Sequence, residues 1–448
     1  MGSGAAQRVG RSDFAGGSLK AGPPHVGFIS TRLAGTDGVS LEAEKWCRIL
    51  TGMGLECFYF AGECDTPPER SVVVPEAHFR HPVVLDLTQR LFAGPTRPPE
   101  VTLQVQTLKD HLKDNLERFV CRFEIDLLII PNALSLPVNV PLGLAVTELI
   151  AETRLPSIGH HHDFSWERSR FAVHAAGDYL RASFPPNLPS LRHVVINSFA
   201  ARQLALRAGV SSILIPNVMD FDSPAPGPDE YSAGLRSALG LHSGEKLLLQ
   251  PTRVVPRKRI ELAFELTRHL AGDCALLISH ASGDEGSAYE AHLRDYAELI
   301  GARVIFASDI FAQARKTLPD GRRVYSLADA YREARMITYP STVEGFGNAF
   351  IETIYHRRPI VMSTYEIFRT DIQPKGFRVI GFEDFVSSET VAQVRQVLDD
   401  PSLAAEIAEH NYELGRRFYS FPTLERRLSL LIQDTLGTEP GAGLFSSS

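Results

Sequence analysis

The sequence predicts an α/β protein built from two doubly wound domains. Short apolar runs alternate with helical patterns along most of the chain, which is typical of parallel sheets. A stretch rich in Pro, Asp and Ser, 221–231, interrupts this alternation, and the same pattern then starts again. The chain has 448 residues, which is more than one ordinary domain requires.

These observations divide the chain into Rossmann-like units and connecting segments. We expect an N-terminal domain over 23–218, a linker over 219–240 and a C-terminal domain over 241–415. A terminal helical segment, 416–437, follows the second domain. The first and last segments, 1–22 and 438–448, are expected to be a flexible leader and a flexible tail.

The first domain is expected to begin with a buried strand over 25–30, a glycine-bearing loop and a helix over 41–51 that Ser40 caps. Residues 62–104 are expected to be irregular because prolines are frequent there. The further strands expected in this domain are 56–61, 126–131, 156–159, 193–197 and 212–216. The further helices expected are 107–123 and 141–153.

The second domain is expected to contain five strands with helices between them, and ligands should bind at the carboxyl ends of the strands. A final helix is expected over 424–436. The five strands are 246–250, 275–279, 303–306, 336–339 and 359–362.

Composition excludes several classes of protein. The net charge of −7 gives no overall attraction to nucleic acid, and no apolar run reaches the about 18 residues that a membrane span needs. The five cysteines include no Cys-x-x-Cys pair, which favours a reduced, cytoplasmic setting. The sequence leaves the oligomeric state open, a homo-oligomer included.

The segment 341–352 carries two carboxylates, Glu344 and Glu352, eight residues apart and separated by a glycine-containing turn. It follows an apolar run, so we expect a strand, a tight loop with Glu344, and a helix with Glu352 about two turns inside it. Amide groups at such a helix N-terminus bind anions. Hence the segment suits a sugar linked to a nucleotide diphosphate, and the alternative is a surface helix with two ordinary glutamates. The turn residues are Gly345, Phe346, Gly347 and Asn348.

A basic turn, 252–259, follows the strand expected over 246–250. Arg253 and Lys258 lie five residues apart across a proline, and both could turn toward one point above the sheet to stabilise a departing diphosphate. The alternative is a solvated basic turn, since Arg257 and Arg259 include some charge that faces solvent.

Three consecutive histidines, His160, His161 and His162, precede Asp163. Neighbouring residues of an extended chain point to opposite faces, so all three rings cannot reach one metal ion. The alternative to a sugar-binding role is a histidine run ordered by packing alone.

Glycines in the loop after the first strand allow its backbone to approach a ligand closely. A plain turn between strand and helix explains these glycines nearly as well. The candidates in that loop are Gly35, Thr36, Asp37 and Gly38.

The Glu-x7-Glu and Arg-x4-Lys patterns resemble those of retaining glycosyltransferases of the GT-B fold, in particular glycosyltransferase family 4. The arrangement of His161 and Asp163 resembles members that make sucrose phosphate, trehalose or glycosylated glycerate. The resemblance implies two Rossmann-like domains facing a central cleft, with the C-terminal helix crossing back to the first domain. The sequence departs from the family at 363–368, where a Gly-Gly pair is missing, so the resemblance leaves the identity of the donor sugar open.

The implied reaction moves a hexose, glucose or mannose, from a nucleotide diphosphate sugar such as UDP-glucose or GDP-mannose to a hydroxyl of a small soluble acceptor. The acceptor would be a sugar, a sugar phosphate or a glycerate derivative, and neither a metal nor another cofactor is implied. Arg253 and Lys258 would grip the diphosphate, Glu344 the sugar hydroxyls and Glu352 the ribose.

By the same resemblance, His161 would contact the donor sugar, with His160 and His162 as alternatives. The candidates for holding the acceptor are His160, His162 and Asp163. The loop 35–38 would lie near the donor phosphate. A GT-B disaccharide phosphorylase and a non-catalytic protein that binds nucleotide sugars are the alternative functions.

Overall fold

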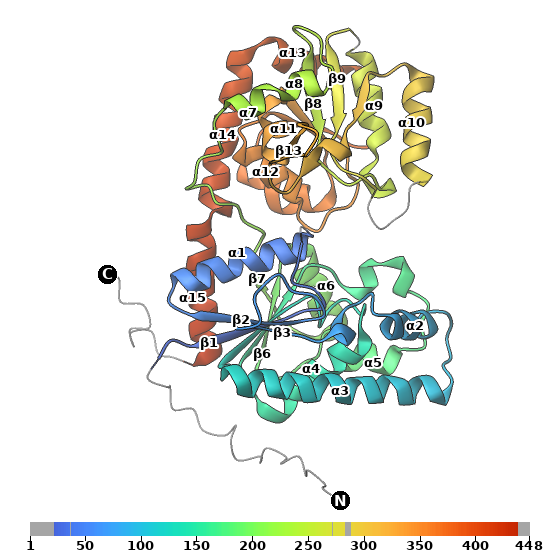
Figure 1. Ribbon diagram of the computed structural model, residues 1–448, viewed down its shortest axis with the longest axis vertical. Coiled ribbons are helices and arrows are strands. Elements are labelled where there is room, and N and C mark those ends of the chain that lie inside the picture. Colours follow the sequence, from blue (N-terminus) through green and yellow to red (C-terminus); the bar gives the residue numbers. More distant parts are fainter. Residues whose placement is uncertain (1–21, 36, 271, 283–287, 438–448) are drawn as a thin grey trace, which may run out of the picture. The chain divides into compact units, whose positions relative to one another are not determined.

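The computed structural model describes residues 22–35, 37–270, 272–282 and 288–437. These residues form two compact units, shown in Figure 1. The first unit contains the chain up to Ile196, Ala200–Ile215 and the chain from Glu425 onward. The second unit contains Asn197–Phe199 and Pro216–Leu424.

A seven-stranded sheet of order β3-β2-β1-β4-β5-β6-β7 forms the centre of the first unit, and all its neighbouring strands run parallel. Every residue of the central strand β4 is buried, as expected when helices cover both faces of a parallel sheet. The strands are β1 (His25–Ile29), β2 (Glu56–Ala61), β3 (Ser71–Val73), β4 (Leu127–Pro131), β5 (Ser157–His161), β6 (Leu191–Val195) and β7 (Ile213–Leu214).

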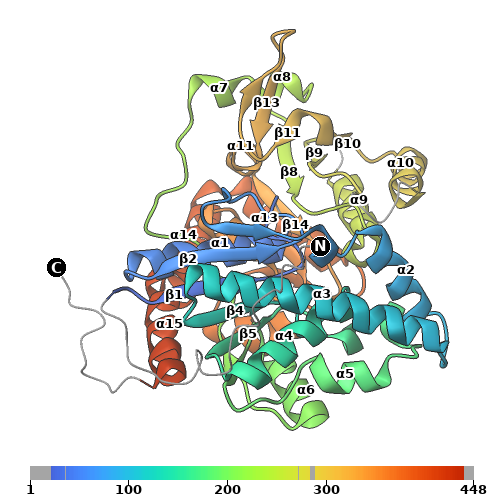
Figure 2. The ribbon, with the colours of Figure 1, turned by 60° about the horizontal axis from the view of Figure 1, so that its bottom comes forward.

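Helices cover both faces of this sheet, with α3 and α4 on one face and α1 on the other (Figures 1 and 2). Apolar side chains of α3 and α4 pack with those of the strands into one large core. The helices of this part of the chain are α1 (Gly38–Gly52), α2 (Pro82–Leu91), α3 (Pro99–Phe123), α4 (Val140–Thr153), α5 (Gly177–Ser183) and α6 (Ser198–Ala208). The last helix, α15 (Phe421–Leu436), enters the first unit at Glu425.

The second unit contains a parallel six-stranded sheet of order β10-β9-β8-β14-β15-β16. A separate three-stranded sheet of order β11-β13-β12 is inserted between β10 and α11. The strands are β8 (Lys246–Gln250), β9 (Cys274–Ile278), β10 (Val304–Phe306), β11 (Phe311–Ala312), β12 (Lys316–Thr317), β13 (Arg323–Ser326), β14 (Met336–Tyr339), β15 (Ile360–Ser363) and β16 (Ile380–Phe382).

Helices connect these strands, and the apolar residues of α9, α13 and the sheet form the core of the unit. The helices are α7 (Glu230–Ala233), α8 (Leu235–Ala238), α9 (Ile260–His269), α10 (Ala288–Ile300), α11 (Leu327–Glu333), α12 (Asn348–Tyr355), α13 (Ser388–Asp399) and α14 (Pro401–Tyr419). The predicted architecture of two doubly wound parallel-sheet units is confirmed. Within the described part of the chain, no helix combines the length and apolarity that crossing a membrane requires.

Three local predictions are wrong. Helix α1 starts at Gly38, because Asp37 and not Ser40 caps it by accepting from the amides of Val39 (3.1 Å) and Ser40 (3.2 Å). The stretch 62–104 is not irregular, since it holds β3, α2 and the start of α3.

The physical reason for the second error is the position of the prolines. Pro82 and Pro99 occupy the first turns of α2 and α3, where a missing amide hydrogen costs nothing, so they start helices instead of preventing them. The final helix likewise begins at Phe421, three residues before the predicted start, with Pro422 in its first turn.

Candidate active site

The loop between β14 and α12 carries Glu344 and the glycine turn. Gly347 has φ of 110°, and a Cβ atom there would lie 2.3 Å from the hydroxyl of Tyr365, so only glycine fits at this position. The Tyr365 hydroxyl also donates to the carbonyl of Phe346 at 2.7 Å, which fixes the turn from the inside. Helix α12 starts directly after Gly347, at Asn348. Backbone amides at this helix start are therefore held in place by the fold.

Glu352 lies about one turn inside α12, not two turns as predicted, because the helix starts only at Asn348. Its side chain accepts a hydrogen bond from the buried hydroxyl of Tyr331 in α11 at 3.1 Å. The side-chain oxygen of Asn348 accepts from Asn217 at 2.7 Å. Both predicted donor-binding residues of α12 thus have fixed partners within the second unit.

Glu344 forms ion pairs with two cations from the loop after β8. Its Oε1 pairs with Nζ of Lys258, and its Oε2 lies 3.4 Å from Nη1 of Arg257. The side chains of Glu344 and Lys258 are each 9% exposed. Burial alone would raise the pKa of Glu344, but the charges of Lys258 and Arg257 outweigh it and hold this pKa below its ordinary value. Glu344 is therefore a carboxylate at neutral pH.

Sequence reasoning gave Arg257 no role in the site. Its guanidinium also donates to the carbonyl of Val343 at 3.3 Å, and its own carbonyl accepts from the amide of Thr342 at 3.2 Å. Arg257 therefore ties the loop after β8 to the loop after β14. Its neighbour Arg259 instead donates to the carbonyl of Asp384. A basic run does not reveal in sequence which of its members turns inward.

The loop after β9 adds His280 to these residues. The amide of Val254, next to the exposed Arg253, donates to the carbonyl of Ala281 at 3.2 Å, so His280 and Arg253 lie in adjoining loops. Burial lowers the pKa of His280 to about 4, and the charges of Arg253 and Lys258 act in the same direction. His280 is therefore neutral at pH 7, and its ring lies where the two cations act on it.

The residues of the second unit therefore come together at one edge of its sheet. Strands β9, β8 and β14 are adjacent in the sheet, and the loops that follow them carry His280, Arg253 with Lys258, and Glu344. Two cations, one carboxylate and the amides at the start of α12 can bind a diphosphate and a hydroxyl-rich group. Tyr339, at the end of β14, places its ring 5.3 Å from Nζ of Lys258 and lies against the ring of Tyr365.

The histidine run lies at the end of β5 in the first unit, and all three rings are buried. His160 stacks on Trp46 at 4.1 Å, and its ring nitrogens make no hydrogen bond with any residue that the structure describes. Nε2 of His161 lies 2.9 Å from Nδ1 of His193. The backbone amide of His162 donates to Asn132 at 2.7 Å.

Burial keeps these histidines neutral. It lowers the pKa of His160 and His161 well below the ordinary value, and the pKa of His162 and His193 to about 4. A neutral imidazole can donate or accept a hydrogen bond to a sugar hydroxyl. The role of His161 in sugar contact, with His160 and His162 as alternatives, stays a prediction.

Asp163 and the glycine loop complete the predicted residues of the first unit. Asp163 forms an ion pair with Arg168 at 2.7 Å. Asp37 caps α1, pairs with Arg32 at 3.0 Å, and its negative charge also acts on His162. The amide of Gly35, a residue with φ of 71°, donates to Asp65 at 2.8 Å.

Gly38 is the first residue of α1, and Thr36 lies outside the described residues. Roles in ligand binding for this loop stay predictions. Over the described ranges, no three His, Cys, Asp or Glu side chains are grouped so that they could hold a metal ion.

Comparisons with known proteins identify related chains. No profile of a known protein family matches the chain. The chain is 32% identical over 442 residues to a mannosylglucosylglycerate synthase of Thermotoga maritima, an alignment that covers 90% of this chain and 98% of the relative. A synthase of the same name from Petrotoga mobilis is 29% identical over 88% of this chain and 98% of its own length.

Among solved structures, the sucrose-phosphate synthase of Thermosynechococcus elongatus superimposes with a TM-score of 0.63 at 16% identity and covers 93% of this chain and all of its own. At this identity the likeness shows the fold alone, which is the GT-B fold of glycosyltransferases. The 32% identity to the Thermotoga maritima synthase extends over nearly the full length of both chains and therefore shows the family as well as the fold. The chain therefore belongs to the mannosylglucosylglycerate synthase family, a family of glycosyltransferases with the GT-B fold.

Proposed function

We propose that this protein transfers mannose from GDP-mannose to a hydroxyl of glucosylglycerate and retains the configuration at the anomeric carbon. The observation that carries the proposal is the edge of the second unit where Arg253, Lys258 and Glu344 meet. The transferred sugar and the acceptor come from the name of the two relatives. Of the two donors that the resemblance implies, UDP-glucose and GDP-mannose, only GDP-mannose carries mannose.

In this proposal the diphosphate of the donor lies between Arg253 and Lys258, with the amides at the start of α12 as further donors. Glu344 binds hydroxyls of the mannose, and Glu352 binds hydroxyls of the ribose. In the first unit, the proposal assigns a sugar contact to His161 and an acceptor contact to Asp163. Gly345, Phe346 and the loop 35–38 would approach the donor through their backbone.

The proposed chemistry needs no protein nucleophile. The bond between the anomeric carbon and the diphosphate oxygen breaks while the acceptor hydroxyl forms its bond on the same face of the sugar. The proton of that hydroxyl passes to the departing diphosphate, whose negative charge Arg253 and Lys258 stabilise. Glu344 already forms ion pairs with Lys258 and Arg257. These pairs occupy its carboxylate oxygens, which favours a binding role over a nucleophilic one.

The test is an assay of the full-length protein with GDP-mannose and glucosylglycerate, with the product identified by mass spectrometry and by NMR of the anomeric proton. We expect an α-linked mannosyl product, which would preserve the configuration of the donor. UDP-glucose in place of GDP-mannose is the control for donor choice. An inverted product, or no product from any mannose nucleotide, would contradict the proposal.

A disaccharide phosphorylase would use the same anion-binding edge with inorganic phosphate. Incubation of the mannosylated product with phosphate separates the two functions, because only a phosphorylase would release mannose 1-phosphate. We also propose that transfer is independent of metal ions, so EDTA should leave the rate within about twofold. Loss of activity in EDTA that one divalent ion restores would contradict this part of the proposal.

A further inference from the structure

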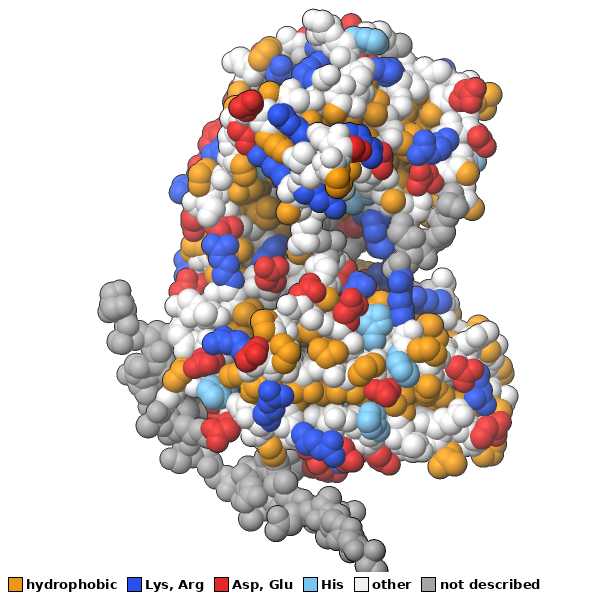
Figure 3. All heavy atoms as spheres, in the orientation of Figure 1, with side chains coloured by type: hydrophobic (Ala, Val, Ile, Leu, Met, Phe, Trp, Pro, Cys, Tyr) orange, Lys and Arg blue, Asp and Glu red, His pale blue; other side chains and the backbone are white. Residues whose placement is uncertain are grey.

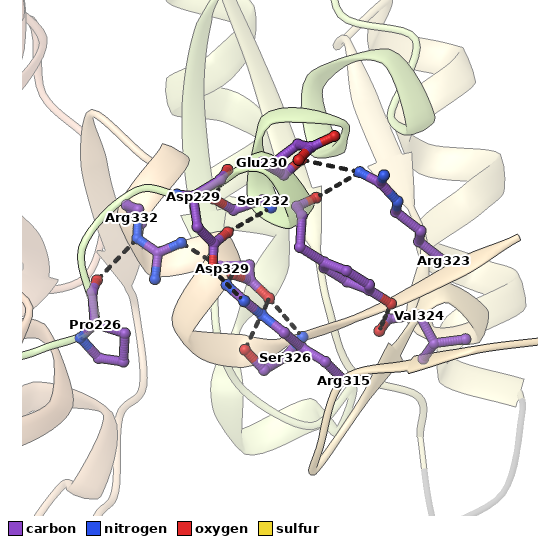
Figure 4. Close-up of polar contacts among 11 residues, drawn as sticks. Pro226, Asp229, Glu230, Ser232, Arg315, Arg323, Val324, Ser326, Asp329 and Arg332 are labelled. Atoms are coloured by element: carbon purple, nitrogen blue, oxygen red, sulfur yellow. Dashed lines mark hydrogen bonds and ion pairs between the residues drawn. The ribbon is translucent and has the colours of Figure 1, made fainter.

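Arg315 joins two segments of the second unit that are distant in sequence. It lies between the inserted strands β11 and β12, and its Nε and Nη2 donate to the two carboxylate oxygens of Asp329 in α11. Its Nη1 binds Asp229, which caps α7, at 2.5 Å. Figure 4 shows the Arg315 side chain between the two aspartates. The inserted sheet therefore fastens α11 to the segment that precedes α7.

Asp329 is the centre of this cluster. Its side chain is 0% exposed, and it accepts further bonds from the amide (2.9 Å) and the hydroxyl (2.8 Å) of Ser326 and from Arg332 (3.1 Å). Burial alone would raise its pKa, but the bonds from Arg315 and Ser326 hold this pKa below its ordinary value. A buried carboxylate of this kind is stable only where its donors hold one geometry. The start of α11 is thus rigidly placed.

The segment 226–232, called the strap here, covers the same cluster. Arg332 donates through Nε to the carbonyl of Pro226 at 3.0 Å, and Arg323 donates to the carbonyl of Glu230 at 3.0 Å. The Tyr231 hydroxyl donates to the carbonyl of Lys316 at 2.7 Å. The guanidinium groups of Arg315 and Arg323 lie 5.2 and 5.0 Å from the centre of the Tyr231 ring.

Helix α11 also carries Tyr331, two residues after Asp329. The Tyr331 hydroxyl donates to Oε2 of Glu352 at 3.1 Å, and its ring stacks on His356 at 4.6 Å. Tyr331 is 1% exposed, so the surrounding packing holds its ring in place. A shift of α11 would therefore move the hydroxyl that orients Glu352.

We propose that Asp329 and Arg315 are positioning residues for the nucleoside end of the donor, acting on Glu352 through Tyr331. This inference rests on the proposed function, which gives Glu352 the ribose hydroxyls. The bonds between Arg315 and Asp329 hold α11 so that Glu352 is oriented before the donor arrives. Preorganisation of this kind lowers the cost of binding, because one carboxylate rotamer is already selected.

The test compares GDP with 2′,3′-dideoxy-GDP, which lacks the ribose hydroxyls, by calorimetry on the full-length protein. The wild type should bind GDP roughly tenfold more tightly than the analogue, as expected for hydrogen bonds to a charged group. Asp329→Asn and Tyr331→Phe should bind GDP several-fold more weakly and the analogue unchanged. Arg315→Lys should lie between the wild type and Asp329→Asn.

Arg323→Gln is the matched control, since Arg323 donates to the carbonyls of Glu230 and Tyr231 and lies against the Tyr231 ring, and these contacts do not reach α11. It should keep the preference for GDP over the analogue. Tyr331→Phe removes one hydroxyl and keeps the packing, so it tests the inference even if Asp329→Asn fails to fold.

Equal weakening of GDP and the analogue in the variants would show a general loss of structure and overturn the inference. A wild type that binds GDP and the analogue equally would overturn it as well. In both cases the proposed transfer reaction stands, because the donor is still bound, although the second result would also remove the ribose role proposed for Glu352. A wild type that binds neither GDP nor UDP would instead overturn the proposed function and the inference together.

Discussion

Lys258 and Glu344 stand 86 residues apart in the chain and form a buried ion pair. The pair exists because β8 and β14 are neighbours in the sheet, so that the loops after them meet. In the free protein each charge is compensated by the other. A donor diphosphate would add negative charge beside Lys258 and so turn this pair into part of a larger charge network.

Removing Lys258 should therefore affect both stability and nucleotide binding. Lys258→Met leaves the Glu344 carboxylate buried with Arg257 alone, and we expect a loss of about 3–5 kcal/mol in the free energy of unfolding. The double variant Lys258→Met/Glu344→Gln should lose less than the sum of the single variants. Denaturant titrations of the four proteins measure this coupling.

Lys246→Met is the control for that cycle, since Lys246 pairs with the exposed Asp399. We expect a change of about 0–1 kcal/mol for it. In thermal-shift assays, GDP should raise the Tm of the wild type and of the control but not that of Lys258→Met. Full stabilisation of Lys258→Met by GDP or UDP would show that Lys258 does not bind the diphosphate.

The two glutamates should differ in kinetics. Glu344→Gln should lower kcat more than it changes KM, because the proposed sugar contact strengthens as charge develops during transfer. Glu352→Gln should mainly raise the KM of the donor, because a ribose contact is the same in ground state and transition state. His161→Ala should resemble Glu344→Gln. Steady-state rates at varied donor concentration give kcat and KM for each variant. The opposite pattern for the two glutamates would reverse their assignments.

Arg257 should act on the reaction through Glu344. Arg257→Gln removes the contacts to Glu344 and Val343, so Glu344 gains freedom, and we expect kcat to fall roughly tenfold, about 1.4 kcal/mol. Arg257→Lys should recover part of the rate. Arg259→Gln is the matched control two residues away, where the side chain binds Asp384 instead. Similar losses in both variants would point to a general charge effect and not to positioning.

The buried histidines should make the protein sensitive to mild acid. The pKa of His193 is about 4 in the folded state against an ordinary value of 6.5, so the unfolded state binds more protons between these pH values. The free energy of unfolding must then fall as the pH drops from 6.5 to 4. Each such histidine contributes a slope of about 1.4 kcal/mol per pH unit.

His193→Gln should reduce that slope by about 1.4 kcal/mol per pH unit, even if the variant is less stable overall. Urea titrations at several pH values between 4.5 and 6 give the slope. An unchanged slope for His193→Gln would mean that this ring is protonated in the folded protein.

Local patterns in the chain were sufficient for much of this description. Alternating apolar and helical runs predicted two parallel-sheet units, because a strand buried on both faces must be apolar throughout. The spacing of Glu344 and Glu352 around a glycine turn placed both next to a helix start, because strand, loop and helix are adjacent in sequence. For the same reason the errors lie at helix starts, where Asp37 and the first-turn prolines compete with their neighbours for the cap.

Contacts across long stretches of chain depended on the folded arrangement. No local pattern distinguishes Arg257, which reaches Glu344, from Arg259, which does not. The neutral state of the histidines follows from burial beneath Trp46 of α1 and beside His193 of β6. The fixed position of Asp329 in α11 needs Arg315 from the inserted sheet. Such pairings depend on strand order and on exclusion of water, and both arise only when distant segments pack together.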